Sequence, residues 1–187
     1  MVQEPGHCPM TDDWLRLDRA RAGDKAAWEI LFEQYYPALV RMAFVITGSY
    51  PSGQDIAQEA FVDLLRANIR HRDGSLKSFL STIAYRKALK ERQNLLARGS
   101  LDGDAVTDET PSILEGVVKN ETDRLILCAV RTLAIEQREV LTLRYFGEQS
   151  YEEIAQALKI PLGTVKSRIF YAIKSCRDKL SKQGVFK

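Results

Sequence analysis

The stretch that most constrains the fold of this chain runs from Ser150 to Leu180, where a proline separates two helical patterns. Ser150 and Glu153 form an S-x-x-E capping box, in which each side chain satisfies a backbone N–H at a helix start. Apolar residues follow at helical spacing, at Ile154, Ala155 and Leu158. Pro161 has no N–H to donate, so it ends the first pattern and suits the start of the second. The stretch therefore predicts two helices joined by a tight turn.

The second of these helices is predicted to have two different faces. With about 100° per residue, its apolar side chains gather on one side, at Val165, Ile169, Ala172 and Cys176. The opposite side carries small, aromatic and cationic residues, at Gly163, Ser167, Phe170, Tyr171 and Lys174, with Lys166 and Arg168 on the flanks. In a DNA major groove, cations bond phosphate and guanine, hydroxyls bond base edges, and aromatic carbons touch the thymine methyl. The pattern favours a helix that reads DNA.

Charge supports this interpretation. From Lys159 to Lys187 there are eight Lys or Arg residues and one Asp, a net charge of +7, which is typical of a segment that binds a polyanion. A helical hairpin with a solvated basic face would carry the same charge. Exposed Phe170 beside Tyr171 favours DNA binding, because exposed aromatic patches usually mark a site of interaction.

The segment from Leu133 to Leu180 resembles region four of bacterial sigma factors of the extracytoplasmic-function (ECF) group of the sigma-70 family, most specifically in EEIAQAL and GTVKSRIFYA. The resemblance implies that the helix-turn-helix reads the minus-35 element of a promoter. The side chains implied in that contact are Lys166, Ser167, Arg168, Phe170, Tyr171 and Lys174, with Arg168 and Lys174 on phosphate. Response-regulator output domains share the helix-turn-helix but would not account for the other half of the chain.

Residues 54–68 (QDIAQEAFVDLLRAN) predict a helix with one apolar and one polar side. The polar side holds Asp55, Gln58 and Glu59, and by composition alone it fits solvated surface. D-x-x-Q-E-x-F is nevertheless similar to the most recognisable part of sigma region two. That resemblance implies that Asp55, Gln58 and Glu59 dock on the coiled coil of the β′ clamp helices of core RNA polymerase, where such polar contacts set orientation and partner choice.

Residues 69–98 predict a basic loop and a helix from about Leu76, whose apolar face is expected to stop after Ile83. Eight Lys or Arg residues against two acids give a net charge of +6, so this is a second nucleic-acid candidate; a solvated helix with a charged end is the alternative. The resemblance implies minus-10 recognition and duplex opening by Arg70, Arg72, Lys77, Tyr85, Arg86 and Lys90. Where the family usually has Trp, Asn, Asp and Arg, this chain has Phe79, Arg86, Lys90 and Gln93. The resemblance therefore does not predict which minus-10 bases are read.

The whole chain is predicted to be all-α, with two small helical domains joined by a flexible acidic linker. A disordered tail at 1–10 precedes the region-two domain at 11–96, and the linker at 97–123 precedes the region-four domain at 124–182. Helices are expected at 11–21, 24–48 (kinked or divided at Pro37), 54–68 after a turn at 49–53, 76–96, 121–133 (with Leu125, Cys128, Ala129 and Leu133 inward) and 136–145.

The linker is acidic: seven carboxylates face one lysine between Asp102 and Asp123. In the family this segment threads through RNA polymerase near the active-site channel, although a solvated acidic tether accounts for the composition equally well.

Composition argues against chemistry of the chain's own. Three cysteines and two histidines are scattered without C-x-x-C or H-x-x-H spacing, so neither a disulfide framework nor a zinc site is expected. There is no Walker-type glycine loop and no Ser/His/Asp set, so we expect no enzyme activity, no metal and no cofactor. No signal peptide is recognisable, and no apolar run approaches the ~18 residues of a membrane span. We therefore expect a reduced, cytoplasmic protein without membrane insertion.

These expectations describe an alternative sigma factor that binds core RNA polymerase and directs it to specific promoters. The resemblance also implies an anti-sigma factor as a partner, because members of the group are usually held inactive by one. A stand-alone helix-turn-helix regulator of transcription is the alternative, but it would not need the N-terminal half. An interaction module captured by a regulatory partner is compatible with the sigma interpretation.

Overall fold

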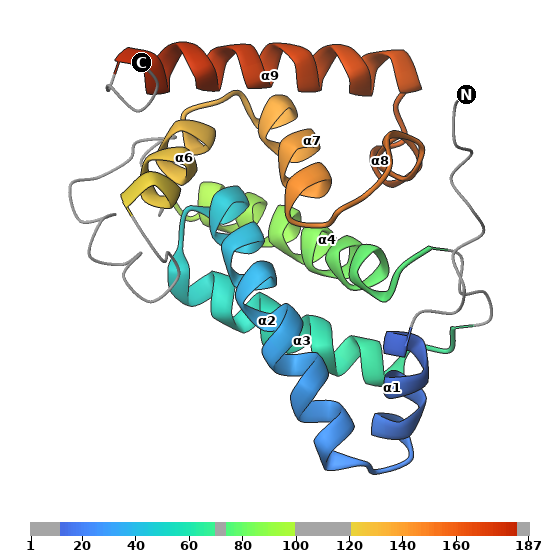
Figure 1. The fold of residues 1–187 in the computed structure, drawn as a ribbon. Helices are drawn as coiled ribbons and strands as arrows, with labels where there is room; N and C mark the ends of the chain where they lie inside the picture. The colour runs from blue at the N-terminus through green and yellow to red at the C-terminus, as the bar shows by residue number, and fades with distance from the viewer. Residues whose placement is uncertain (1–11, 70–73, 100–120, 183–187) are drawn as a thin grey trace, which may run out of the picture.

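The fold is taken from a computed structural model, which describes residues 12–69, 74–99 and 121–182. Over these ranges it contains eight helices and no strand (Figure 1), so the all-α prediction is confirmed. The tail at 1–10 and most of the linker at 97–123 lie outside the described residues, so the domain boundaries stay predictions.

The N-terminal group of helices comprises α1 (Asp12–Arg21), α2 (Lys25–Thr47), α3 (Tyr50–Arg66) and α4 (Leu76–Ala97). The central helix is α2, which contacts the other three. It runs through Pro37 to Thr47 as one helix, not two. An interior proline costs a helix about 3 kcal/mol. That cost is offset because nearly every side chain from Leu39 to Thr47 is buried.

The start of α3 differs from the expected turn at 49–53. The helix begins at Tyr50, because the Ser49 side chain accepts a hydrogen bond from the Ser52 N–H at 3.3 Å and caps the first turn, where Pro51 is tolerated. Gly53 marks a close helix crossing, since a Cβ there would lie 3.0 Å from the Val40 carbonyl oxygen of α2. Residues that punctuate turns elsewhere thus serve here as a helix start and a packing contact.

The C-terminal group comprises α6 (Glu121–Arg131), α7 (Ile135–Tyr145), α8 (Tyr151–Leu158) and α9 (Leu162–Lys182). The inward stripe of α6 was predicted in part: Ala129 and Leu133 are buried as expected, but Leu125 and Cys128 are only partly buried, and Leu127 and Val130 are buried as well. The reason is that α6 packs against both α9 and α2, and the second contact could not be foreseen from its own pattern.

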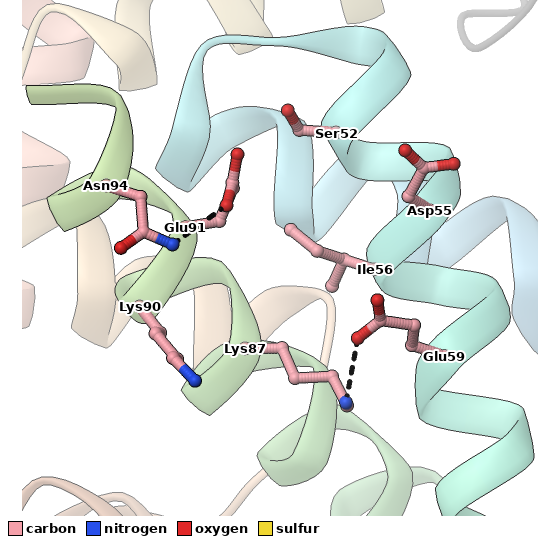
Figure 2. Close-up of a pocket in the computed structure, with 8 residues that line it drawn as sticks. All are labelled: Ser52, Asp55, Ile56, Glu59, Lys87, Lys90, Glu91 and Asn94. Carbon is pink, nitrogen blue, oxygen red and sulfur yellow. Dashed lines mark hydrogen bonds and ion pairs between the residues drawn. The ribbon is translucent and has the colours of Figure 1, made fainter. Parts of the chain in front are cut away.

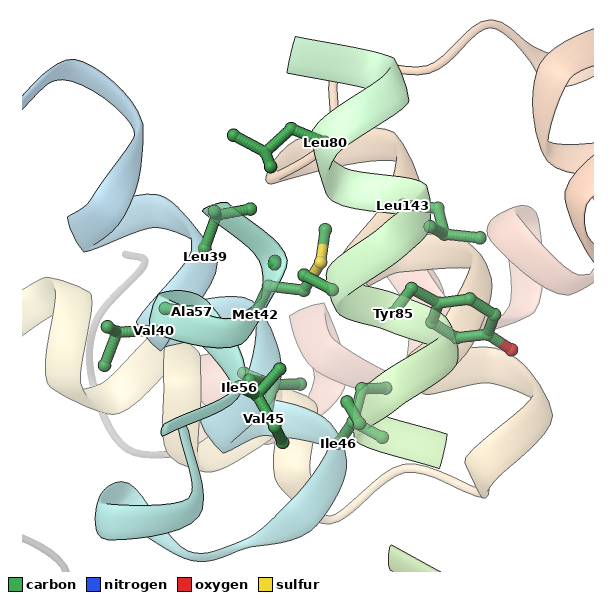
Figure 3. Close-up of a cluster of buried hydrophobic side chains, with 14 of the residues drawn as sticks. Leu39, Val40, Met42, Val45, Ile46, Ile56, Ala57, Leu80, Tyr85 and Leu143 are labelled. Carbon is green, nitrogen blue, oxygen red and sulfur yellow. The ribbon is translucent and has the colours of Figure 1, made fainter. Parts of the chain in front are cut away.

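The two groups share one core. Helix α7 lies against α2 and α4, and Leu143 of α7 belongs to the same buried cluster as Met42, Ile46 and Tyr85 (Figure 3). The fully buried Arg138 of α7 donates hydrogen bonds to the carbonyl oxygens of Val45, at 3.4 Å, and Leu133, at 2.9 Å. The packing of α7 against α4 also explains why the apolar face of α4 does not stop at Ile83 as predicted. The buried face continues through Ala84, Tyr85 and Ala88.

Candidate functional site

The outer face of α9 is arranged as the sequence predicts. Val165, Ile169 and Ala172 are buried against the C-terminal group, while Phe170 and Tyr171 are 64% and 56% exposed. The two aromatic rings meet edge to face with centroids 5.4 Å apart. Lys166, Ser167 and Lys174 are exposed beside them and Arg168 is half-buried. The six predicted minus-35 residues therefore lie together on one helix.

Local contacts in the helix-turn-helix orient this face. The capping box of α8 is present: Glu153 N–H donates to Ser150 Oγ at 3.1 Å, and Ser150 N–H donates to the Glu153 carboxylate at 2.7 Å. Lys159 ends α8 in the left-handed region, with a φ of 55°. The Ile160 N–H then bonds the Ala155 carbonyl at 3.1 Å, and α9 follows Pro161. The turn angle is thus determined by residues adjacent in sequence.

The predicted polymerase-binding residues also share one face. Asp55, Gln58 and Glu59 are exposed on α3, and Ile56, Ala57 and Ala60 are buried behind them. Polar groups aligned on an exposed helix face could dock on a second helix by hydrogen bonds and ion pairs. Their orientation matches the prediction, although no partner is present to test it.

Lys87 of α4 is a residue of this site that the sequence interpretation missed. Its Nζ lies 2.9 Å from Glu59 Oε2 and 2.9 Å from Asp63 Oδ2, so it joins α4 to two carboxylates of α3 (Figure 2 draws the Glu59 pair). Burial lowers the pKa of Lys87, but hydrogen bonds to Asp63 and Glu59 outweigh burial and leave that pKa above its usual value. Two carboxylates four residues apart on one helix were the sequence signal that called for a cation.

A groove runs between α3 and α4 around this ion pair. Figure 2 shows Asp55 and Glu59 on its α3 side and Lys87 and Lys90 on its α4 side. Asp55 and Glu59 were predicted to bind polymerase, and Lys90 to bind promoter DNA. The structure places these two sets of predicted residues on opposite walls of the same groove.

The predicted minus-10 residues are divided between two sides of α4. Arg70 and Arg72 lie outside the described residues, and Arg86 and Lys90 are exposed. Lys77 is paired with Glu148 at 2.6 Å. Tyr85 is only 3% exposed, and its hydroxyl donates to the Glu139 carboxylate of α7. Lys77 and Tyr85 are thus covered by the C-terminal group, which the sequence interpretation did not predict.

Glu139 connects the covered side of α4 with α9. Burial raises the pKa of Glu139, and the hydrogen bond from Tyr85 and the charge of Arg168 oppose that rise without cancelling it. Burial likewise raises the pKa of the Tyr85 hydroxyl, with the Glu139 charge adding to the effect. One carboxylate of α7 therefore interacts with predicted DNA-binding residues of both regions.

Metal ligands, membrane-spanning helices, cysteines and a further groove were also considered among the described residues. Among them, no group of three His, Cys, Asp or Glu side chains is placed to hold a metal ion. No helix in the described ranges combines the length and apolarity needed to cross a bilayer. Cys128 and Cys176 are free and half-buried, and burial raises the pKa of both thiols. An apolar groove between α6, α7 and α9, lined by Ile126, Tyr145 and Ile173 among others, was not predicted.

Comparison with known proteins agrees with this arrangement. Residues 31–95 match the family described as Sigma-70 region 2, and residues 123–176 match Sigma-70, region 4. The chain is 32% identical to the RNA polymerase sigma-H factor of Pseudomonas aeruginosa, over 86% of this chain and 89% of that protein. It is 30% identical to the ECF RNA polymerase sigma-E factor of Escherichia coli K12, over 90% of this chain and 94% of that protein.

A solved structure shows the same fold. A chain of the complex of the sigma factor RpoE with the anti-sigma factor NepR from Bartonella quintana superposes with a TM-score of 0.60 and 20% identity, covering 82% of this chain and 96% of that chain. The family matches and the relatives lead to one assignment: the chain belongs to the sigma-70 family, in its extracytoplasmic-function group.

Proposed function

We propose that this chain is an alternative sigma factor that binds core RNA polymerase and directs it to specific promoters. The observation that carries the proposal is the presence, in one chain, of an acidic and amide face on α3 and an aromatic and cationic face on α9, each within a matched sigma region. A stand-alone regulator would need only the second of these.

The α9 face would enter the major groove of the minus-35 element. Lys166, Ser167, Phe170 and Tyr171 would contact bases, and Arg168 and Lys174 would bind phosphates. Their support is exposure and arrangement: the aromatic pair stands out from a helix whose other side is buried. Base-edge and methyl contacts give sequence preference, whereas phosphate contacts position the helix.

The α3 face would dock on the β′ clamp helices through Asp55, Gln58 and Glu59. Lys87 holds Glu59 in place from α4, so the docking face is tied to the helix that would meet the minus-10 element. Charged contacts of this kind fix orientation and suppress wrong partners more than they add affinity.

Helix α4 and the loop before it would engage the minus-10 element as the duplex opens. Removing a base from the stack costs a few kcal/mol, which contacts to the single strand must offset. Arg86 and Lys90 are exposed for this role, and Arg70 and Arg72 would join them from the loop. Two DNA-binding regions held on one polymerase gain by effective concentration, so each can be weak alone.

The chain would act in the cytoplasm and carry no catalytic activity, since RNA synthesis belongs to the polymerase. An anti-sigma factor is the expected regulatory partner, by analogy with the RpoE complex that shares the fold.

The experiment is comigration with bacterial core RNA polymerase on size exclusion. Asp55→Ala/Gln58→Ala/Glu59→Ala is compared with a matched control, Glu29→Ala/Glu33→Ala/Gln34→Ala, which removes the same charges and one amide from the exposed side of α2. Comigration of wild type and control, with loss in the α3 variant, supports the function and the docking face. Comigration of all three proteins would support the function but show that the docking site lies outside Asp55, Gln58 and Glu59. Failure of the wild type to bind core polymerase, while it still binds duplex DNA, would favour the stand-alone regulator.

A further inference from the structure

Lys87 lies where the predicted docking face of α3 meets the predicted DNA-binding helix α4. Its Nζ is 2.9 Å from Glu59 Oε2 and 2.9 Å from Asp63 Oδ2, so one ammonium is shared by two carboxylates. Glu59 belongs to the predicted docking face, and Asp63 follows it by one turn on the same side of α3. The charge that α3 presents to a partner therefore depends partly on a side chain of α4.

Both carboxylates remain accessible to a partner. A hollow of about 500 Å³ lies over α3, lined by the three predicted docking residues together with Asp63 and Lys87 among others. The side chains of Glu59 and Asp63 are 64% and 47% exposed, whereas that of Lys87 is 26% exposed. A cationic side chain of a partner that enters this hollow can therefore reach the same carboxylates that Lys87 already holds.

The bonds that Lys87 makes are of an exchangeable kind. Ion pairs with exposed partners contribute little net stability, because water solvates the separated charges almost as well. A lysine carries its compact charge on a flexible four-carbon stem, which can swing without moving the helix. Burial lowers the pKa of Lys87, but hydrogen bonds to Asp63 and Glu59 leave that pKa above its usual value, so the side chain is a cation. A second cation that approaches these carboxylates would repel it.

A displaced Lys87 would have a second use on α4. Lys90 lies three residues further along the helix, on the same side, and both lysines line the groove between α3 and α4 (Figure 2). Lys90 is exposed and is one of the predicted minus-10 residues. Phosphate contacts from lysine position a nucleic-acid strand without reading its sequence. Released from α3, Lys87 would therefore add a second cation beside one that is already placed for DNA.

We propose that Lys87 is an internal substitute for a cation of the docking partner. In the free protein it occupies Glu59 and Asp63; a cationic side chain of core RNA polymerase replaces it there, and the released ammonium binds the phosphate backbone of the minus-10 strand. The inference rests on the proposed docking role of α3 and DNA-binding role of α4. Polymerase docking and strand binding then favour each other, and by linkage the coupling is the same in both directions.

The first test measures the affinity for bacterial core polymerase in the absence of DNA. Lys87→Met removes the charge and keeps an unbranched stem; its matched control, Lys25→Met, removes one positive charge from the exposed start of α2. Only Lys87→Met is expected to bind more tightly, by roughly threefold, because no internal cation has to leave its carboxylates. Circular dichroism checks that both variants are folded. Affinity equal to the control, or weaker, would overturn the proposal.

The second test measures DNA binding by the assembled holoenzyme. A short randomised single strand is titrated at several salt concentrations, by fluorescence anisotropy. Lys87→Met is expected to bind the strand more weakly and to reduce the salt slope by roughly 0.7, the value of one phosphate contact on single-stranded DNA; Lys25→Met should match the wild type. A merely structural role would weaken binding to polymerase as well. Tighter polymerase binding without the loss on DNA would overturn the proposal.

A third test does not depend on the folding of a Lys87 variant. A carbodiimide joins a lysine to a carboxylate in contact with it, and mass spectrometry identifies the pair. The Lys87–Asp63 link is expected in the free protein and should fall several-fold when core polymerase is added. In Asp55→Ala/Gln58→Ala/Glu59→Ala, which lacks the docking face, polymerase should leave the link unchanged. A link that persists in the wild-type complex would overturn the proposal.

These tests separate the exchange of Lys87 from the proposed function. If neither the wild type nor Lys87→Met binds core polymerase, the proposed sigma function fails. If both bind it with equal affinity, the sigma function stands and only the exchange fails.

Discussion

The two predicted DNA-binding helices, α4 and α9, differ in what covers them. The outer face of α9 is open, with Phe170 and Tyr171 more than half exposed. On α4, Tyr85 is buried and Lys77 is paired with Glu148. The difference teaches that a cationic or aromatic pattern can predict a binding helix, whereas the exposure of that helix depends on segments far away in the chain.

The largest effect is expected from Arg138→Ala. Arg138 is 1% exposed and donates to the carbonyls of Val45 and Leu133 at the contact between the two helix groups. Removing it leaves both acceptors buried without this donor, and we expect a loss of about 3 kcal/mol in the free energy of unfolding. Urea denaturation measures it, with Arg86→Ala as an exposed control expected to stay within about 0.5 kcal/mol. Equal effects would show that the groups do not depend on Arg138.

The open face of α9 should respond differently. Phe170→Ala should leave stability within about 0.5 kcal/mol but remove discrimination worth about 1–3 kcal/mol at one base pair of the minus-35 element. Lys174→Ala should weaken binding about equally for all sequences and reduce the salt slope by roughly 1. Duplexes selected from a random library, titrated at several salt concentrations, distinguish the two. Identical behaviour of both variants would show that the orientation assigned to α9 is wrong.

Tyr85→Phe tests the covered helix with a smaller change. It removes the hydroxyl that donates to Glu139 and leaves that carboxylate without this donor. The free energy of unfolding should fall by about 1 kcal/mol. Urea denaturation measures the change. Tyr171→Phe, on the open face of α9, should leave the free energy of unfolding unchanged; an equal loss in both variants would remove the contrast between the helices.

The smallest effect is a pH dependence of the free energy of unfolding. Burial raises the pKa of Glu139, which faces Tyr85 and Arg92 of α4, Arg168 of α9 and Glu136 of its own helix. A raised pKa means that the folded protein binds a proton at Glu139 more readily than the unfolded chain does. The contribution of this proton to stability is therefore greatest at low pH, and it is lost as pH rises through the raised pKa.

Urea denaturation between neutral and mildly acidic pH should show this contribution as a gain in stability on acidification. Glu139→Gln, which cannot titrate, should flatten the change; a gain that persists in this variant would assign it to another group.

The parts of the site that were predictable are those set by adjacent residues. The capping box of Ser150, the turn at Pro161 and the apolar stripe of α9 orient its outer face without help from elsewhere. The exposed polar face of α3 was likewise predicted from the helical spacing of its apolar residues. The start of α3 was misjudged because Pro51 and Gly53 are also common in turns. The closeness of the Val40 carbonyl, which explains Gly53, appears only in the fold.

The unpredictable parts depend on contacts between distant segments. The stripe of α6 and the length of the apolar face of α4 both follow from packing between the two helix groups. Lys87 was counted as one basic residue among many, because its pairing with Glu59 and Asp63 requires α3 and α4 to be side by side.

The apolar second half of α2 has a consequence for any separation of the two helix groups. The Arg131 guanidinium carbon of α6 lies 4.9 Å from the centroid of the Phe44 ring, and the Val45 carbonyl accepts a hydrogen bond from Arg138 of α7. Moving the C-terminal helices away would bring this surface of α2 into contact with water, where apolar area is disfavoured by about 25 cal/mol per Å². A separated arrangement should therefore be rare in the free protein, and a partner that stabilises it would have to cover the same apolar surface.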